Sequence, residues 1–269
     1  MRNFYQRLRI WNRARRYRWH DEPDECRFAC EAIRAGDVAL DIGAHKAAFT
    51  WWMSRQVGRN GRVHAFEPQP DLARYLHDFA QASSYQNVIV HELALADHRS
   101  SAQFLVPLTH RGWGRLRTPT DAEEAGRWIQ VDVDLLDHVL NPETAPRPIA
   151  FIKCDVELHE LAVFRGAAQI LSIDRPILLF ESHPLTQVAS DENQTFSYLS
   201  SLGYRGYFFY EQQLIPVEKY WGARHHLTND QVQNYVFLHP ATVTLVHAKP
   251  PYQLQRHTDR IRAGFAHVA

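Results

Sequence analysis

The chain has 269 residues, of which 45% are hydrophobic and 22% are charged, with a formal net charge of zero. This balance is typical of a globular protein and excludes a disordered or collagen-like chain. The sequence contains no run of about 18 apolar residues and begins without the apolar stretch of a secretory signal, so we expect a soluble protein. Three scattered cysteines (Cys26, Cys30 and Cys154) favour a reducing, cytoplasmic location over a disulfide framework.

The zero net charge conceals a basic amino-terminal segment. Residues 1–20 contain seven arginines and no acidic residue, which leaves the rest of the chain acidic. Phe4, Leu8 and Trp11 recur at helical spacing, so residues 1–35 are predicted to form a basic helical arm with one apolar stripe. Three interpretations remain open: docking on the acidic body or on a second subunit of a homo-oligomer, peripheral contact with an anionic membrane, and a solvated helix. Docking is favoured because the complementary charge is already present in the chain, and no nucleic-acid partner is expected.

Beyond the arm, short apolar runs alternate with helical patterns. Strands are expected at residues 38–42, 63–66, 88–93, 104–107, 149–155, 176–181, 204–210 and 234–238. Helices are expected at residues 49–57, 71–83, 158–171 and 193–202, the last ending at Gly203, and residues 108–127 are predicted to be a loop. This alternation predicts a doubly wound α/β domain over residues 36–245, followed by a carboxyl-terminal extension at residues 246–269.

Ligands of open parallel sheets bind beyond the carboxyl ends of the strands, so the strand ends are the places to look for a site. The first strand ends in Asp41-Ile-Gly43-Ala-His45, a glycine turn that lacks the G-x-G-x-x-G pattern of dinucleotide-binding proteins. The second strand ends in Glu67-Pro68, where a carboxylate can accept hydrogen bonds from both hydroxyls of a ribose. The alternative for Glu67 is an exposed carboxylate at the entry to a helix.

These two strand ends resemble the S-adenosylmethionine site of class I methyltransferases, and the subtype they resemble is the FkbM family. The resemblance continues through residues 92–97 and 133–137, and it is most specific in Phe151-Ile-Lys-Cys-Asp155-Val-Glu157-Leu-His159-Glu-Leu-Ala-Val-Phe-Arg-Gly-Ala167. It implies a Rossmann-like, mostly parallel seven-stranded sheet with an antiparallel last strand. It also implies transfer of a methyl group from S-adenosyl-L-methionine, with S-adenosyl-L-homocysteine as product, to a hydroxyl of a carbohydrate or another hydroxylated small molecule.

The resemblance also implies roles for individual residues. The methionine part of the cofactor would be held by Asp41, Gly43, Ala44 and His45, with Thr50 nearby, and the ribose by Glu67. The turn at Leu95, Ala96 and Asp97 would border the adenine, and Asp155 would lie nearest the reacting methyl group.

Ionisable residues converge at the ends of the fourth and fifth strands. Asp155, Glu157, His159, Glu181 and His183 are candidates for general-base chemistry. Asp155 and Glu181 on adjacent strand ends also resemble the Mg²⁺ arrangement of catechol-type O-methyltransferases, so a divalent cation is the alternative. A structural interpretation remains for Glu157, as a carboxylate in the first turn of a helix, and for His183, as a loop residue before Pro184.

Three positions depart from the family pattern, which usually has asparagine where His45 stands and glycine where Ala47 and Leu158 stand. Ala47 and Leu158 motivate a second hypothesis, a catalytically degenerate protein that only binds S-adenosylmethionine. A nicotinamide-dependent dehydrogenase is disfavoured because the glycine fingerprint is missing. Trp113, between two glycines of the predicted loop, either stacks on a sugar or packs onto the core.

Overall fold

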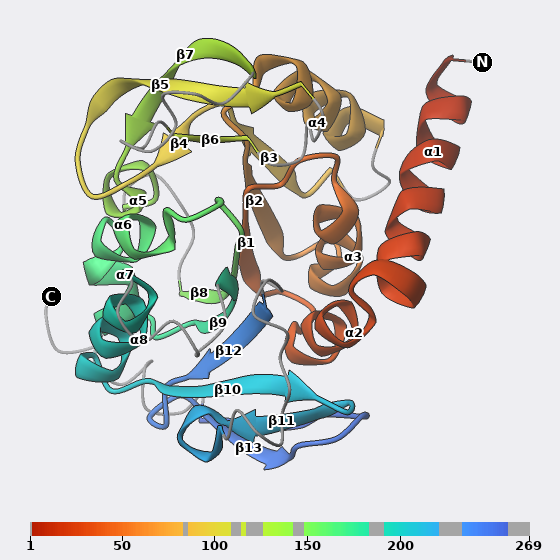
Figure 1. The fold of residues 1–269 in the computed structure, drawn as a ribbon. Coiled ribbons are helices and arrows are strands. Elements are labelled where there is room, and N and C mark those ends of the chain that lie inside the picture. The colour runs from red at the N-terminus through yellow and green to blue at the C-terminus, as the bar shows by residue number, and fades with distance from the viewer. Residues whose placement is uncertain are drawn as a thin grey trace, which may run out of the picture.

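An eight-stranded sheet forms the centre of the computed structural model, in the order β11-β10-β12-β9-β8-β1-β2-β3 (Figure 1). The structure describes residues 2–82, 86–108, 114–116, 126–141, 148–182, 191–220 and 233–257. The strands of this sheet are β1 (Val38–Ile42), β2 (Arg62–Phe66), β3 (Val88–His91), β8 (Ile149–Cys154), β9 (Ile177–Ser182), β10 (Arg205–Tyr210), β11 (Gln213–Pro216) and β12 (Gln233–Leu238). The predicted α/β class is confirmed.

Strand directions show how the sheet differs from the predicted one. The strands β3, β2, β1, β8 and β9 pair in parallel, whereas β12 is antiparallel to β9 and to β10. Therefore β10 runs in the direction of β9, and β11, which pairs antiparallel with β10, is reversed. The predicted count of seven strands is wrong, because the edge strand β11 makes the sheet eight-stranded and two strands, β12 and β11, are reversed. The sequence did not predict β11 as a strand.

Helices cover both faces of the sheet (Figure 1). One face carries α2 (Pro23–Ala32), α3 (Ala48–Val57) and α4 (Pro70–Ala82), and the other carries α5 (Leu136–Val139), α6 (Glu160–Arg165), α7 (Ala168–Ile173) and α8 (Asp191–Ser201). Each face has its own cluster of buried apolar side chains. Because β1 is buried along its whole length, its sequence is apolar at nearly every position rather than alternating.

The single helix predicted at residues 158–171 is wrong, because the chain forms two short helices, α6 and α7. The break falls at Gly166, where a Cβ atom would lie 2.0 Å from the carbonyl oxygen of Ala96. Glycine therefore lets this turn pack against a distant backbone segment. The first helix begins only at Glu160, because Glu157 and Leu158 have positive φ values of 53° and 75°.

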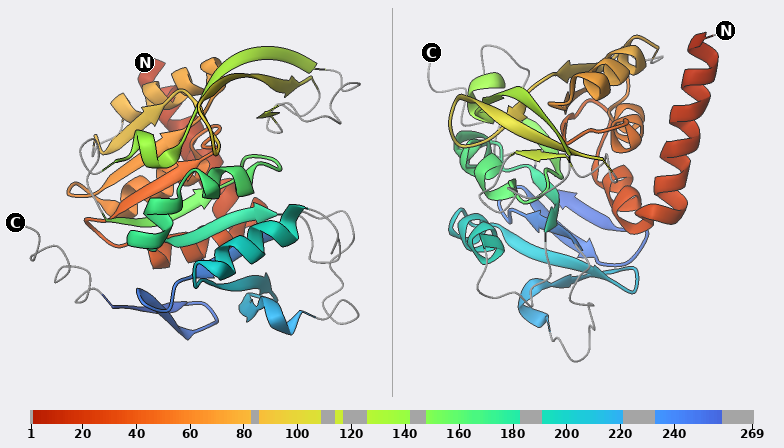
Figure 2. Two further views of the ribbon diagram at one scale, coloured as in Figure 1. Left: turned by 90° about the vertical axis from the view of Figure 1, so that its left-hand side faces the viewer. Right: turned by 45° about the horizontal axis from the view of Figure 1, so that its top comes forward.

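A smaller sheet lies above the main one, in the order β4-β7-β5-β6 (Figure 2). Its strands are β4 (Ala94–Leu95), β5 (Ser100–Pro107), β6 (Arg115–Leu116) and β7 (Gly126–Asp134). The loop predicted at residues 108–127 is therefore wrong where β6 and the start of β7 fall.

A third sheet is a hairpin of two strands, β13 (Val243–His247) and β14 (Gln253–Arg256). In the chain it comes after β12, which is itself preceded by a 3₁₀ turn, η3 (Val217–Lys219). Arg256 joins this hairpin to the body through an ion pair with Asp37 at 2.7 Å.

The amino-terminal arm forms helix α1 (Arg2–Arg16) and a π-helical turn, η1 (Tyr17–Asp21), and it lies against α3 and α4. Docking on the body is thus confirmed, but the predicted docking face is wrong. Ile10 and Ala14 are buried and Trp52 donates a hydrogen bond to the carbonyl oxygen of Ala14 at 2.8 Å, whereas Leu8 and Trp11 are 41% and 38% exposed. Within the described ranges, no helix combines the length and the apolar character needed to cross a membrane.

Candidate functional site

A cavity of about 240 Å³ opens at the carboxyl ends of β1, β2 and β8. Between β1 and β8 the strand order reverses, because the chain proceeds from β1 to β2 on one side and reaches β8 on the other. This is the position at which open α/β sheets bind ligands. The predicted site residues that line the cavity are Asp41, Gly43, Ala44, His45, Glu67, Leu95, Asp155, Glu157 and Glu181.

The glycine turn after β1 is in direct contact with the end of β8. Gly43 has a φ of +77°, and a Cβ atom there would lie 1.8 Å from the carbonyl oxygen of Asp155. Glycine is therefore required for the two strand ends to meet, rather than only for the approach of a ligand. The turn continues through His45 and Ala47, whose φ values are 47° and 64°. Ala47 thus retains the left-handed backbone conformation that favours glycine.

Asp41 lies at the base of this turn with almost no exposure. Its Oδ2 accepts a hydrogen bond from the hydroxyl of Thr50, while its Oδ1 is buried without a partner among the described residues. Burial raises the pKa of Asp41, and the nearby charge of Lys153 acts in the opposite direction. Thr50 itself does not line the cavity but holds Asp41 from behind.

Glu67 connects the end of β2 to the glycine turn. Its Oε2 accepts a hydrogen bond from the backbone N–H of His45 at 2.9 Å, and its Oε1 accepts one from the N–H of Gln69 at 3.0 Å. Burial raises the pKa of Glu67 to about 7 in spite of these hydrogen bonds. The interpretation of Glu67 as an exposed helix-entry carboxylate is wrong, because the side chain is buried and lines the cavity.

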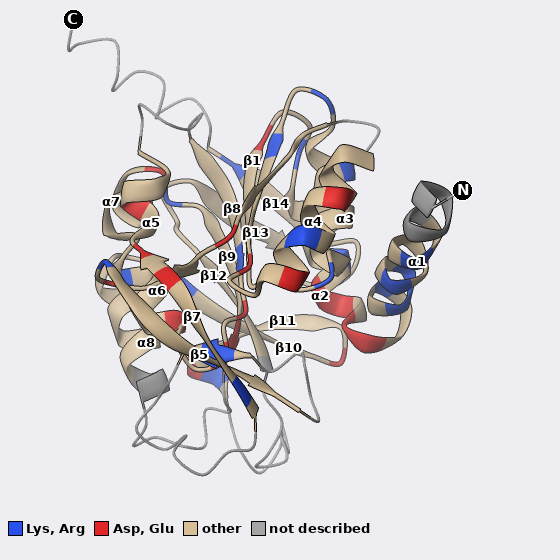
Figure 3. Ribbon diagram, turned by 90° about the horizontal axis from the view of Figure 1, so that it is seen from above, with Lys and Arg blue, Asp and Glu red and all other residues tan. Residues whose placement is uncertain are grey.

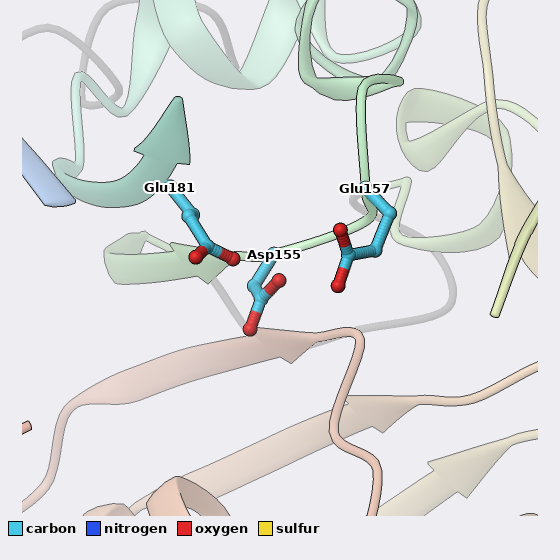
Figure 4. A group of neighbouring side chains, drawn as sticks. All are labelled: Asp155, Glu157 and Glu181. Carbon is cyan, nitrogen blue, oxygen red and sulfur yellow. The ribbon is translucent and has the colours of Figure 1, made fainter. Parts of the chain in front are cut away.

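Three carboxyl groups that line the cavity lie close to one another (Figure 4). Asp155 and Glu157 follow β8 and Glu181 belongs to β9, and each offers an oxygen atom within 4.8 Å of the others. Burial raises the pKa of Glu157 to about 7 and that of Glu181 to about 11. Glu181 therefore retains its proton and shares it with Asp155 through a hydrogen bond between the two side chains.

Lys153 lies beneath this cluster and is nearly inaccessible to solvent. Its Nζ is 2.8 Å from Oδ2 of Asp155 and 5.0 Å above the ring of Phe49. Burial alone would lower the pKa of Lys153, but the charges of Asp155, Asp41 and Glu22 outweigh it and raise the pKa above its usual value. A buried ammonium group is thus balanced by the buried carboxyl groups of Asp155 and Asp41, which we call the acidic floor of the cavity.

Several predicted residues are not brought to the cavity. His159 precedes α6, and its Nδ1 lies 3.5 Å from the carbonyl oxygen of Glu157. Ala96 is buried in the core. Asp97 lies on the surface, where its Oδ1 is 2.8 Å from Nδ1 of His98. None of the three lines the cavity, and of the predicted adenine border Leu95 alone does so among the described residues. His183 and Trp113 lie outside the described residues.

Other residues of the cavity were not predicted from the sequence. Tyr17 and Glu22 come from the amino-terminal arm, and an aromatic and aliphatic wall is formed by Phe49, Phe66, Phe104 and Leu116. Lys153 was visible as the only charged residue within the apolar run of β8, which indicates a buried charge that needs partners. No sequence signal connected the arm to the site.

A family model described as the methyltransferase FkbM domain matches residues 41–205, a range that starts at Asp41 and includes both strand-end loops. The chain belongs to the FkbM methyltransferase family. The expected family resemblance is therefore confirmed over more than half of the chain. No curated protein sequence matches this FkbM-family chain.

Solved structures that are similar to this chain include further methyltransferases. The FkbM methyltransferase of Methylobacillus flagellatus KT is 15% identical, with a TM-score of 0.48 over 84% of this chain and 53% of that one. The chain thus spans about half the length of that protein. A SAM-dependent O-methyltransferase of Thermotoga maritima is 13% identical (TM-score 0.44, 80% and 64% covered). Fibrillarin of Aeropyrum pernix, solved with S-adenosyl-L-methionine, is 14% identical (TM-score 0.45, 77% and 68% covered).

Proposed function

We propose that this FkbM-family protein transfers the methyl group of S-adenosylmethionine to a hydroxyl of a carbohydrate or another hydroxylated small molecule. The observation that carries the proposal is the meeting of Asp155, Glu157 and Glu181 beside the glycine turn of β1. Methyl transfer to a hydroxyl requires an oriented oxygen that loses its proton, and this cluster offers groups that accept a proton.

The residues of the glycine turn fit S-adenosylmethionine. A buried acceptor without a partner costs about 1–3 kcal/mol, so the buried Oδ1 of Asp41 favours a ligand that donates a hydrogen bond there. The same holds for the buried Nε2 of His45, which has no partner in the described part of the chain. Asp41 and residues 43–45 would hold the methionine part of the cofactor, and Glu67 would bind the ribose. Leu95, together with the apolar wall of the cavity, would contact the adenine. The cofactor, when bound, supplies a methyl group on a positively charged sulfur.

Glu157 is the proposed general base. With a pKa of about 7, a large fraction of its carboxyl groups is ionised at neutral pH and able to take the proton of the acceptor hydroxyl. Asp155 has a different role, because Lys153 and the proton donated by Glu181 hold its pKa below the usual value although burial acts against them. It therefore stays ionised and serves to orient the acceptor. The catalytic roles of His159, which does not line the cavity, and of His183, which lies outside the described residues, stay predictions.

A divalent cation such as Mg²⁺ is the alternative use of the same cluster. Carboxylate oxygens are its preferred ligands, and Asp155 and Glu181 are the residues proposed to hold it, with Glu157 close enough to join them. Binding would require Glu181 to release the proton that it shares with Asp155. Metal binding is therefore expected to strengthen as the pH rises.

The degenerate alternative is less well supported. Ala47 and Leu158 replace the usual glycines but keep positive φ values of 64° and 75°, so both loops retain the backbone conformation that glycine would adopt. The carboxyl groups of Asp155, Glu157 and Glu181 also lie together at the cavity. These observations favour an active enzyme over a protein that only binds the cofactor.

A product assay tests the proposal. The full chain is incubated with S-adenosylmethionine and a panel of sugars and phenolic alcohols, and S-adenosylhomocysteine and methylated acceptor are measured by mass spectrometry. We expect both products in equal amounts, with Asp155→Asn inactive. Binding of S-adenosylhomocysteine without turnover on any acceptor supports the degenerate alternative instead. Full activity in excess chelator supports the general-base mechanism. Loss of activity in chelator that Mg²⁺ or Mn²⁺ restores supports a bound divalent cation instead.

A further inference from the structure

A second cavity, of about 470 Å³, lies between helix α1 and the start of α4, next to the proposed active site. Arg9, Arg13 and Arg16 line it from successive turns of one face of α1. Lys46 from the glycine turn lines it from the opposite side. The charged positions that Figure 3 shows along α1 are all basic. We call this cavity the basic groove.

The basic groove adjoins the proposed active site. Tyr17 and Lys46 line both cavities, so these two side chains lie where the groove and the cavity with the carboxyl cluster meet. A third cavity, which Lys46 also lines, brings Arg127 to the same side. The groove thus extends outward from the proposed active site along basic side chains.

The positive charge of the groove is only partly compensated. Arg16 pairs with Asp21 at 2.9 Å, and Asp71, the acidic residue of the groove, lies 3.9 Å from Arg127. Arg9 and Arg13 form no ion pair with any residue that the structure describes. Their helix is fixed by the hydrogen bond from Trp52 to the carbonyl oxygen of Ala14 and by the edge-on contact of Tyr17 with Phe49. Two guanidinium groups are therefore held at the groove without an ion pair to any of the described carboxylates.

The field of these groups extends into the active site. Burial lowers the pKa of His45 to about 4, and the charges of Lys46 and Arg13 contribute to the same effect. Burial raises the pKa of Tyr75 in the groove, and the charges of Arg13 and Arg9 act against it. An anionic group in the groove would meet favourable potential along its length.

We propose that the basic groove binds a phosphate group of the acceptor, so that the hydroxyl to be methylated belongs to a phosphorylated molecule. A phosphate monoester is close to a dianion at neutral pH, which matches the two uncompensated arginines, and guanidinium groups bind phosphate oxygens in pairs. The inference rests on the proposed function for the position of the hydroxyl, whereas phosphate binding itself does not depend on methyl transfer. The phosphate belongs either to a soluble sugar phosphate or to a lipid headgroup.

Calorimetry of the full chain with glucose 1-phosphate at low salt tests the proposal, with glucose as the uncharged reference. The double variant Arg9→Gln/Arg13→Gln removes the two uncompensated charges. Its control, Arg15→Gln/Arg55→Gln, removes two charges that lie over the rings of Trp11 and Trp51, outside the groove. We expect the groove variant to bind glucose 1-phosphate at least about tenfold more weakly, since each lost charge-assisted hydrogen bond has that order of effect, and the control to change less than about twofold.

Sedimentation with vesicles that contain phosphatidic acid, whose headgroup is a phosphate monoester, distinguishes the source of the phosphate. Loss of vesicle binding in the groove variant but not in the control assigns the phosphate to a lipid headgroup and supports the proposal. Equal losses in both variants, for either probe, show general charge attraction and overturn it. Absence of wild-type binding to both probes also overturns it.

S-adenosylhomocysteine binding separates this inference from the proposed function. All three proteins are expected to bind it with equal affinity, which also shows that the groove variant is folded. If wild type binds S-adenosylhomocysteine but neither phosphate probe, only the phosphate site is wrong. If glucose 1-phosphate binds through Arg9 and Arg13 while S-adenosylhomocysteine does not bind, the phosphate site stands and the proposed function is wrong.

Discussion

The loop after β1 and the loop after β8 meet at the cavity but are built differently. Both contain two adjacent or nearly adjacent non-glycine residues with positive φ, His45 and Ala47 in the first and Glu157 and Leu158 in the second. In the first loop Ala47 is completely buried and the N–H of His45 is bonded to Glu67. In the second loop Leu158 is 55% exposed, and Glu157 has a raised pKa.

We propose that this difference separates the side of the cavity that binds the cofactor from the side that carries out the reaction. Hydrogen bonds and burial fix the loop after β1, as a site that must recognise one cofactor requires. The loop after β8 has an unfavourable backbone conformation and carboxyl groups that share or exchange protons, and such features cluster where chemistry takes place. Lys153 lies between the two loops, and its charge acts on both Asp41 and Asp155.

The largest expected effect is on the reacting side. Glu157→Gln removes the proposed base, and we expect kcat to fall by a factor of about 100 or more, while the Kd of S-adenosylhomocysteine changes less than about twofold. In wild type, kcat/KM should rise with pH through about 7, because the base must be ionised, and the variant should lack this rise. Glu92→Gln, an exposed carboxylate after β3, serves as the control. A variant with unchanged kcat and pH profile would contradict the role of Glu157.

The connection between the two sides is tested by Lys153→Met. Removal of one partner from a buried ion pair leaves uncompensated charges, so the free energy of unfolding should fall by about 3–5 kcal/mol in urea denaturation. This loss should shrink as the pH falls, because Asp41 and Asp155 then take up protons and no longer carry the uncompensated charge. Arg59→Met, which is exposed, should change stability by less than about 0.5 kcal/mol. Equal stabilities of Lys153→Met and wild type would show that the buried lysine does not stabilise the acidic floor.

A smaller effect should distinguish the backbones of the loops. Leu158→Gly relieves a left-handed conformation that costs about 1–2 kcal/mol, and the greater freedom of glycine in the unfolded chain cancels part of this gain. We expect net stabilisation of about 0.5–1 kcal/mol. Leu108→Gly is the matched control, since Leu108 is also exposed but has no positive φ, and this change should not stabilise the protein. Destabilisation by Leu158→Gly would mean that the loop conformation is not strained.

Much of the sheet was predictable from the sequence because buried parallel strands are continuous apolar runs. The strand at residues 38–42 was predicted to its observed bounds. By contrast β7, with exposed and half-buried positions along its length, lacks such a run and was placed partly in a loop. The break at Gly166 depends on contact with Ala96, some 70 residues away in sequence, which no local pattern contains.

The site was predictable to the extent that it lies at strand ends. Asp41, Glu67, Asp155, Glu157 and Glu181 were all placed at the cavity by this rule. Contributions from the amino-terminal arm were missed, because periodicity identifies an apolar stripe but not which face of a helix packs inward. The arm packs with Ile10 and Ala14 and leaves Trp11 exposed, and it thereby brings Tyr17 and Glu22 to the cavity.

Calorimetric titration with S-adenosylhomocysteine tests the central claim, that the loop after β1 holds the cofactor together with Glu67 at the end of β2. We expect wild type to bind and Glu67→Ala to bind more weakly by about 1–3 kcal/mol, because the ribose hydroxyls and the N–H of His45 lose a buried acceptor. Asp71→Ala, an exposed carboxylate four residues away, should bind as wild type does. Absence of binding by wild type, or equal affinities of wild type and Glu67→Ala, would contradict the account.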